Sequence, residues 1–362
     1  MLQNNGFRRR ALVGSPFTRD GIDVVSVISL SGIYERESFY RDVLGITFLD
    51  MRDVSGTNCM CDDVAKELLL DRIGNGCGTS AVRAAFDGGS VDERSRMQDN
   101  ANGILPYGLH FIDNGNYHYL SALYLSMVKE PFSLVVLDHH PDMQRPMFDI
   151  LSCGGWVLEV LEKNQFVRDV HIIGADRKLI EELDPADREK VKFYDVDEIF
   201  GGVGFDAGEV RGIGNVCGAG VSGICLPDTN YPVYLSIDKD VIRRSELTTN
   251  WDQGEMAASQ VLGLAKALLH GTKSGSVGCD CKDDGRETVG RDGSVYRTES
   301  DDATGQAEKK HVTGRADSDI RLLGIDVCGE CAPDQEDCDL EKAIASNDEF
   351  NRKILELFKS PD

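Results

Sequence analysis

The feature that most constrains the fold is a series of short apolar runs, each ending in an aspartate or a small residue. The runs lie at 22–30, 108–113, 133–138, 170–175, 191–195, 233–238 and 320–326. Continuous hydrophobic strands of this length are typical of a parallel sheet that is buried on both faces. Stretches with helical character occur at 119–129, 156–164, 177–183, 252–270 and 340–358. Because strands and helices alternate, the sequence predicts an α/β sandwich.

The charge of the chain argues against two classes of partner. Lys and Arg total 39 against 62 Asp and Glu, which gives a formal net charge of −23. Such a surface repels phosphate backbones and anionic lipid, so we expect no nucleic acid and no membrane as partners. No apolar run approaches the roughly 18–20 residues that span a bilayer, and no signal-cleavage pattern is visible. We therefore expect a cytoplasmic protein.

The eleven cysteines show no disulfide or zinc framework. Their number is odd, and a chain of 362 residues does not need disulfides to stabilise its core. The closely spaced pairs are Cys59/Cys61, Cys279/Cys281 and Cys328/Cys331. Zinc sites usually combine two such pairs, whereas these lie far apart in unlike contexts. Reduced thiols in or near the core are the main interpretation, and a structural zinc or a redox pair is the alternative.

Polar stretches suggest how the chain is divided. Residues 271–319 contain no Leu, Ile, Met, Phe or Trp, so they bury too little apolar surface to offset their ordering entropy. We expect a mobile surface insertion there. A second polar stretch at 87–102 separates an N-terminal segment, residues 1–104, from a main domain at 105–362. The Gly-rich run at 201–220 lacks the strand and helix of a dinucleotide loop, so no organic cofactor is expected.

The candidate chemistry lies at the carboxyl ends of the strands, where open parallel α/β sheets bind their ligands. The strongest motif is Asp138-His139-His140-Pro141-Asp142, directly after a strand. In an extended segment alternate residues point the same way, so Asp138, His140 and Asp142 would project together. Gathered carboxylates repel one another unless protons or cations neutralise them.

Two further motifs bring more ligands to the same edge. Ser236–Asp240 places Asp238 and Asp240 on one side of a strand end, and His118 stands between another strand and the helix after it. Aspartates 113 and 326 are expected at this edge as well. Mixed carboxylate and imidazole ligands suit Mn(II) or similar divalent ions, whereas thiolates favour zinc. Four carboxylates are more than one ion usually needs, so a site for two metal ions is predicted.

These motifs resemble those of the ureohydrolases, the family of arginase, agmatinase and formimidoylglutamase. The resemblance rests on D-x-H-x-D at 138–142, S-x-D-x-D at 236–240 and the strand–His–helix junction before them, and it covers roughly 105–358. The stretch 324–333 is similar to the family's last strand, where D-x-x-E-x-x-P is usual, with Gly329 as an extra residue before Glu330. The resemblance implies an arginase- and deacetylase-like three-layer α/β/α sandwich with a mostly parallel sheet of about eight strands.

The resemblance also implies a reaction, the hydrolysis of a C–N bond in a small cationic guanidino, amidino or formimino compound. One Mn(II) would be held by His118, Asp138, Asp142 and Asp238, and the second by Asp138, His140, Asp238 and Asp240. Two such ions lower the pKa of a bridging water, and the resulting hydroxide would attack the trigonal carbon. Asp142 would orient the hydroxide, and Glu330 would pair with the substrate cation. Because ureohydrolases assemble as trimers and hexamers, the resemblance also makes a homo-oligomer one of the expected partners.

Departures from the family pattern keep other functions open. The histidine that arginases carry after D-x-H-x-D is replaced by the stretch 152–156, and the family's G-G-D-H segment by 112–118. One alternative is a zinc-dependent amide deacetylase with a single metal ion on the related fold. The other is a catalytically silent metal-binding protein.

Overall fold

The computed structural model describes residues 24–43, 45–74, 106–201, 224–270 and 321–358. Two short antiparallel strand pairs lie outside these ranges: β1 (Phe17–Thr18) with β2 (Gly21–Ile22), and β12 (Glu287–Val289) with β13 (Val295–Arg297). Apart from β12 and β13, the predicted insertion at 271–319 lies outside the described residues, as do the polar stretch at 87–102 and most of the Gly-rich run.

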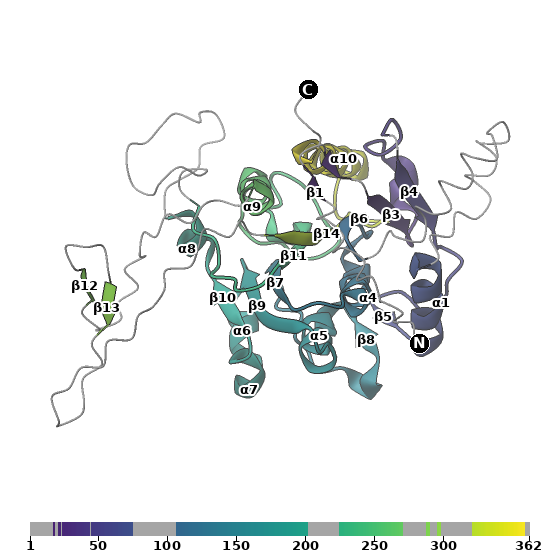
Figure 1. Ribbon diagram of the computed structural model, residues 1–362. Helices are drawn as coiled ribbons and strands as arrows, with labels where there is room; N and C mark the ends of the chain where they lie inside the picture. The colour runs from purple at the N-terminus through teal and green to yellow at the C-terminus, as the bar shows by residue number, and fades with distance from the viewer. Residues whose placement is uncertain are drawn as a thin grey trace, which may run out of the picture.

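An eight-stranded sheet forms the centre of the molecule, and every neighbouring pair of its strands is parallel. The order across the sheet is β10-β9-β7-β11-β14-β6-β3-β4 (Figure 1). The strands are β3 (Val25–Ser29), β4 (Ile46–Asp50), β6 (Gly108–Phe111), β7 (Phe132–Leu137), β9 (Val167–Ile173), β10 (Lys192–Tyr194), β11 (Val233–Asp238) and β14 (Leu322–Cys328). The prediction of a parallel α/β sheet of about eight strands is confirmed.

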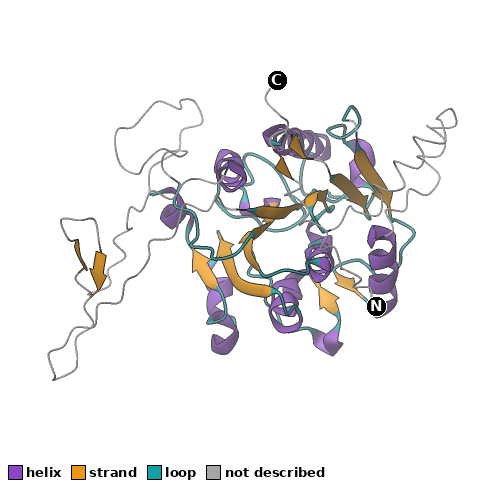
Figure 2. Ribbon diagram, viewed as in Figure 1, coloured by secondary structure: helices purple, strands orange, loops and turns teal. Residues whose placement is uncertain are grey.

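Helices cover both faces of this sheet (Figure 2). They are α1 (Asp63–Gly74), α4 (Leu120–Met127), α5 (Trp156–Lys163), α6 (Arg177–Glu181), α7 (Pro185–Arg188), α8 (Val196–Phe200), α9 (Ala258–His270) and α10 (Leu340–Leu357). In β7, Leu134 and Val136 pack in a cluster with α1, α4 and α5, whereas Val135 and Leu137 pack in a second cluster with α9 and α10. Alternate strand residues therefore face opposite helical layers, which is why the strands read as continuous apolar runs.

The N-terminal part of the chain contributes two strands to the same sheet. The run expected at 22–30 forms β3, and β4 pairs with it at the edge of the sheet. β4, with the sequence Ile-Thr-Phe-Leu-Asp, is only half-buried over most of its length and is not among the runs expected from the sequence. The sheet thus includes residues on both sides of position 104.

Shorter elements connect the strands to the surrounding loops. One two-stranded antiparallel pair joins β5 (Met60–Cys61) to β8 (Leu151–Ser152). The 3₁₀ turns are η1 (Ile33–Arg36), η2 (Gly115–Tyr117), η3 (Met147–Asp149), η4 (Cys153–Gly155) and η5 (Lys239–Val241). Among the described helices, none is long and apolar enough to cross a membrane.

The strand order brings the ends of four strands from distant parts of the chain together. β7, β11, β14 and β6 are consecutive in the sheet, although β11 and β14 follow the other two by about a hundred residues or more. Because the strands are parallel, the loops after their carboxyl ends meet at one edge, where such sheets bind ligands.

Candidate metal centre

All six residues predicted as metal ligands lie together at this edge. Asp138 and Asp142 follow β7, Asp238 ends β11, and Asp240 lies in the η5 turn after it. His118 follows η2, at the junction between β6 and α4. His140 lies between Asp138 and Asp142 and is half-buried, whereas the other five side chains are buried.

The imidazole of His118 points into a group of three carboxylates. Its Nδ1 lies 3.2 Å from Asp138 Oδ2, 3.1 Å from Asp142 Oδ2 and 3.2 Å from Asp238 Oδ2. Its Nε2 lies 2.9 Å from the hydroxyl of Ser236. Nδ1 is fully buried and, among the described residues, makes no hydrogen bond of good geometry.

His140 has the corresponding arrangement on the outer side of the cluster. Its Nδ1 lies 2.8 Å from Asp240 Oδ2 and 3.7 Å from Asp138 Oδ1, and its Nε2 lies 3.1 Å from Asp252 Oδ1. Metal-binding histidines usually hold the nitrogen that does not bind the metal in a hydrogen bond, which fixes the tautomer. Both imidazoles of the cluster meet this condition, with Ser236 and Asp252 as the partners.

Backbone amides hold the carboxylates in place. The amide of His140 donates to Asp138 Oδ1 at 2.6 Å, and that of Asp240 donates to Asp238 Oδ1 at 3.0 Å. His139 contributes its backbone amide, which donates to Asp240 Oδ1 at 3.0 Å. Because these bonds come from the loops that carry the carboxylates, the strand-end turns themselves orient the candidate ligands.

These contacts fit divalent cations. Two groups of side chains have ligand atoms close enough to share an ion: His118–Asp138–Asp142 and Asp138–His140–Asp240. Asp138 belongs to both groups. Asp238 adjoins the first group, because its Oδ2 lies 3.2 Å from His118 Nδ1. A buried imidazole nitrogen without a hydrogen bond, surrounded by carboxylate oxygens, is a position that a cation would satisfy. Carboxylate and imidazole ligands without thiolate suit Mn(II) and similar ions.

Burial raises the pKa values of Asp142, Asp238 and Asp240, and repulsion by neighbouring carboxylates adds to it. Burial also raises the pKa of Asp138, but hydrogen bonds to His118 and His140 outweigh it and lower this pKa. Burial and the charge of Asp138 raise the pKa of Asp142 to about 7, and burial with the charges of Asp238 and Asp138 raises that of Asp240 well above its ordinary value. Burial lowers the pKa of His140, but hydrogen bonds to Asp138 and Asp240 outweigh it and raise this pKa to about 12. The cluster therefore holds protons near neutral pH, which a metal ion would have to displace.

Metal affinity should consequently rise with pH. A raised carboxyl pKa and a raised imidazole pKa both mean more bound protons at a given pH, so metal binding releases protons and weakens as the pH falls from 8 to 6. We expect calorimetric titrations of the chelator-stripped protein with Mn(II), in buffers of different ionisation enthalpy, to show this release. An affinity that is equal at pH 6 and pH 8 would contradict the expectation.

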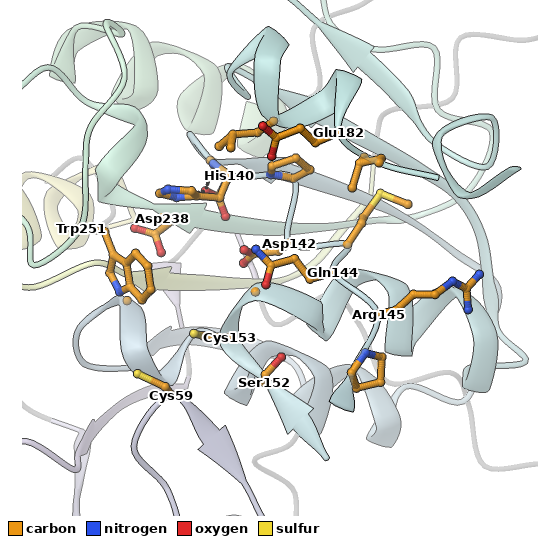
Figure 3. Close-up of a pocket in the computed structure, with 18 of the residues that line it drawn as sticks. Cys59, His140, Asp142, Gln144, Arg145, Ser152, Cys153, Glu182, Asp238 and Trp251 are labelled. Carbon is orange, nitrogen blue, oxygen red and sulfur yellow. Dashed lines mark hydrogen bonds and ion pairs between the residues drawn. The ribbon is translucent and has the colours of Figure 1, made fainter. Parts of the chain in front are cut away.

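A cavity of about 620 Å³ opens onto this cluster (Figure 3). Asp138, Asp142, Asp238, Asp240 and His140 are among its lining residues. Apolar side chains supply much of the remaining wall: Met60, Met143, Ile150, Leu179, Leu183 and Trp251. Concave, largely apolar cavities with a few polar groups at one end are typical of small-molecule sites.

Several solved structures resemble the whole chain in fold. The chain is similar in structure to the ureohydrolases, at low sequence identity. Formimidoylglutamase from Bacillus subtilis is 10% identical, with a TM-score of 0.47 over 100% of this chain and 97% of that one. Agmatine ureohydrolase of Thermoplasma volcanium is 10% identical, with a TM-score of 0.46 over 95% and 92%. Arginase from Bacillus cereus is 11% identical, with a TM-score of 0.43 over 91% and 98%.

Comparison of sequences alone identifies no characterised relative. No protein-family model matches the chain. An uncharacterized protein of Thermotoga maritima is 27% identical over 167 residues, which are 46% of this chain and 55% of the relative. The chain thus spans about half the length of the curated relative that it matches.

Glu330, expected from the ureohydrolase pattern to bind the substrate cation, faces away from the cavity. Its side chain is fully buried and forms an ion pair with Lys239, which is also fully buried. Asn351 Nδ2 donates to Glu330 Oε1 at 2.8 Å and to Glu37 Oε2 at 3.0 Å. Glu330 is not among the residues that line the cavity. In this structure the carboxylate is thus paired inside the fold, and its contact with a substrate cation stays a prediction.

The extra residue Gly329 accounts for this direction. Its φ is +92°, a conformation that favours glycine, and it lies between β14 and Glu330. A Cβ at this position would clash with Asp238 Oδ1 and lie 2.7 Å from the backbone nitrogen of Lys239. The chain thus passes close behind the metal cluster and turns the side chain of Glu330 toward Lys239.

Gly329→Ala should accordingly weaken metal binding. The added methyl group would displace Asp238, so we expect Mn(II) affinity to fall by about 10–100-fold, the range for losing the support of a ligand. Gly45→Ala is the matched control, because Gly45 has a similar φ of +83° but no described residue within 4 Å of the added Cβ. Both variants carry backbone strain, so equal metal affinities in the two would contradict the proposed contact.

The two other aspartates expected at this edge have structural contacts. Asp113 lies two residues after β6. Its Oδ2 accepts hydrogen bonds from the backbone amides of Leu30 and Ser31, which connects the end of β6 to the end of β3. Asp326 does not lie at the edge, because β14 continues two residues further. It is fully buried and accepts a hydrogen bond of 2.8 Å from the hydroxyl of Tyr234.

The cysteine pairs that the structure describes join no candidate metal group. Cys59, Cys61, Cys328 and Cys331 are absent from the groups of potential ligands found among the described residues. Cys279 and Cys281 lie outside those residues.

Sequence patterns missed two tryptophans at the site. Trp156 is fully buried and its indole donates to Asp142 Oδ2 at 2.7 Å, and Trp251 lines the cavity. The chain contains only these two tryptophans. Their rarity, with one close after D-x-H-x-D, is the signal that could have drawn attention to them.

Proposed function

We propose that this protein is a dinuclear Mn(II)-dependent hydrolase that cleaves a C–N bond in a small guanidino, amidino or formimino compound. The observation that carries the proposal is the sharing of Asp138 between two groups of potential ligands at one end of a cavity. The D-x-H-x-D and S-x-D-x-D motifs that supply these ligands support the same reaction class.

Each side chain of the cluster has a defined part in this proposal. One ion would be held by His118, Asp138, Asp142 and Asp238, and the other by Asp138, His140, Asp238 and Asp240. When bound, two divalent ions supply Lewis-acid activation of water and neutralise developing charge. Ser236 and Asp252 keep each imidazole nitrogen Nδ1 directed at the carboxylates. The Trp156 indole holds Asp142 through one oxygen, so that Asp142 can orient the attacking water.

The charges around the cavity support a cationic substrate. Glu182, Asp184 and Asp187 line it in addition to the four carboxylates of the cluster. Among the described lining residues, Arg145 is the only lysine or arginine, and it forms an ion pair with the buried Asp187 at 2.7 Å. The described wall therefore attracts a positive group and offers little to an anionic one.

Metal content and product release test the proposal together. Untagged protein, purified without chelator and reloaded with Mn(II), should contain about two ions per chain, as a dinuclear hydrolase requires. A panel of guanidino, amidino and formimino compounds should then release urea, ammonia or formamide. A single tightly held zinc with release of acetate from acetylated amines would favour the deacetylase instead. Two bound ions without turnover of any compound would favour the silent metal-binding protein.

A further inference from the structure

We propose that Trp251 binds the planar cation of the substrate by presenting the face of its indole to the cavity. The inference rests on the proposed function and concerns how the same site recognises its substrate. It assigns to an aromatic face the recognition that the ureohydrolase pattern suggests for Glu330.

Trp251 lies beside the candidate metal ligands. Its side chain lines the cavity and is 37% exposed, whereas the other tryptophan of the chain, Trp156, is fully buried. The ring centroid lies 5.7 Å from that of His140, with an angle of 70° between the two planes. Figure 3 shows the indole on the same side of the cavity as His140 and Asp238, opposite Arg145. A ligand bound at the carboxylates would therefore lie near the indole.

Hydrogen bonds hold the indole by one edge. Its Nε1 donates to Asn116 Oδ1 at 3.0 Å, and Asn250 Nδ2 donates to the same oxygen at 2.9 Å. The ring also packs on Gly115, where an added Cβ would come within 2.5 Å of Trp251 Cδ1. The Gly115 amide in turn donates to Asn250 Oδ1 at 3.0 Å. Because the polar edge is already bonded to protein, the π-face remains for a ligand.

The loop that carries Trp251 is anchored independently of the indole ring. Gly254 donates its backbone amide to the carbonyl of Asp240 at 2.7 Å, and Met256 donates to that of Val241 at 3.1 Å. Gln335 Nε2 donates to the carbonyl of Thr249 at 2.9 Å. The loop therefore has anchors besides the ring, and binding of a ligand gives a reason for an exposed aromatic side chain here.

An indole face suits the substrate class proposed above. The face carries partial negative charge and attracts cations, and planar guanidinium groups are weakly hydrated and stack on it well. The carboxylate of Glu330, which could otherwise bind such a group, is fully buried in its ion pair with Lys239. Stacking on Trp251 thus supplies the recognition of a planar cation that Glu330 does not.

Two variants and two ligands test this inference by calorimetry on the Mn(II)-loaded protein. Trp251→Phe keeps an aromatic face, whereas Trp251→Leu keeps apolar bulk without one. The ligands are n-butylguanidinium and its neutral isostere n-butylurea. We expect Trp251→Leu to weaken binding of butylguanidinium about tenfold, within the range for a cation on an aromatic face, and Trp251→Phe to weaken it less than about threefold. Binding of butylurea should change less than about twofold in either variant.

Several results would overturn the inference. These are equal affinities of the wild type and Trp251→Leu for butylguanidinium, equal losses for the cation and for the urea, and no binding of butylguanidinium to the loaded wild type. The proposed reaction is judged separately by product release. Guanidine hydrolysis with an unchanged KM in Trp251→Leu would support the reaction and refute this inference. If Trp251→Leu weakens binding of butylguanidinium but not of butylurea and no compound is turned over, the inference is supported and the proposed reaction is refuted.

Discussion

Asp138→Asn should remove both metal ions and reduce hydrolysis to background. Asp138 is the side chain common to the two groups of potential ligands, and its two oxygens face His118 and His140 separately. Asparagine can still accept the backbone hydrogen bond from His140 at 2.6 Å, so the loop should keep its shape while losing a negative charge. The loss should exceed the roughly 10–100-fold that follows when a residue merely supporting a ligand is removed.

Elemental analysis of the reloaded variant checks this expectation. Asp169→Asn is the matched control, because Asp169 also lies 3.1 Å from a histidine nitrogen, that of His171, but lines no part of the cavity. The control should retain about two Mn(II) per chain and full turnover if the site is dinuclear. Asp138→Asn protein that keeps two ions would show that the ligands have been assigned wrongly.

Lys239→Met should destabilise the fold by about 3–5 kcal/mol, the usual cost of leaving one partner of a buried ion pair without the other. Lys239 and Glu330 are both fully buried, so water cannot solvate the carboxylate that remains. A second carboxylate, that of Glu37, lies beside it, and burial and the charge of Glu330 raise the pKa of Glu37 well above its ordinary value. Loss of the ammonium would leave two acids facing each other.

Equilibrium unfolding in urea measures this effect. Adding Glu330→Gln to Lys239→Met removes the unpaired charge and should recover most of the lost stability. Lys353→Met is the control, because Lys353 and Glu349 form an exposed pair at 3.4 Å, for which we expect a change of less than about 1 kcal/mol. If the single Lys239 variant is as stable as this control, the buried pair does not have the role we assign to it.

The candidate metal ligands could be predicted from sequence because their placement depends on local geometry. Asp138, His140 and Asp142 follow one strand at alternate positions, and Asp238 and Asp240 follow another in the same way. The carboxyl ends of parallel strands meet at one edge, so recognising two such strands was sufficient to expect the ligands together. His118 needed the additional resemblance to a known pattern, since a single histidine between a strand and a helix has many other uses.

The surroundings of the candidate metal centre could not be predicted in this way. Lys239 and Glu330 follow the ends of different strands, and their pairing depends on the sheet order, in which β11 and β14 are neighbours. The direction of Glu330 depends further on one residue, Gly329, whose positive φ has no periodic signature. Trp251 lies in an irregular loop, where neither the helical nor the strand period applies.

By itself, then, the sequence determined the parallel α/β architecture and the group of carboxylates and imidazoles at its edge. Both follow from periodic burial and from residues adjacent to strand ends, which are short-range properties of a chain. Only the tertiary structure decided that Glu330 is neutralised by Lys239 inside the fold, that β4 extends the sheet from the N-terminal side, and that Trp251 lines the cavity. These features depend on contacts between segments far apart in the chain, such as Asn351 with Glu37 and Trp251 with Asn116. Such contacts exist only once the sheet order has brought the segments together.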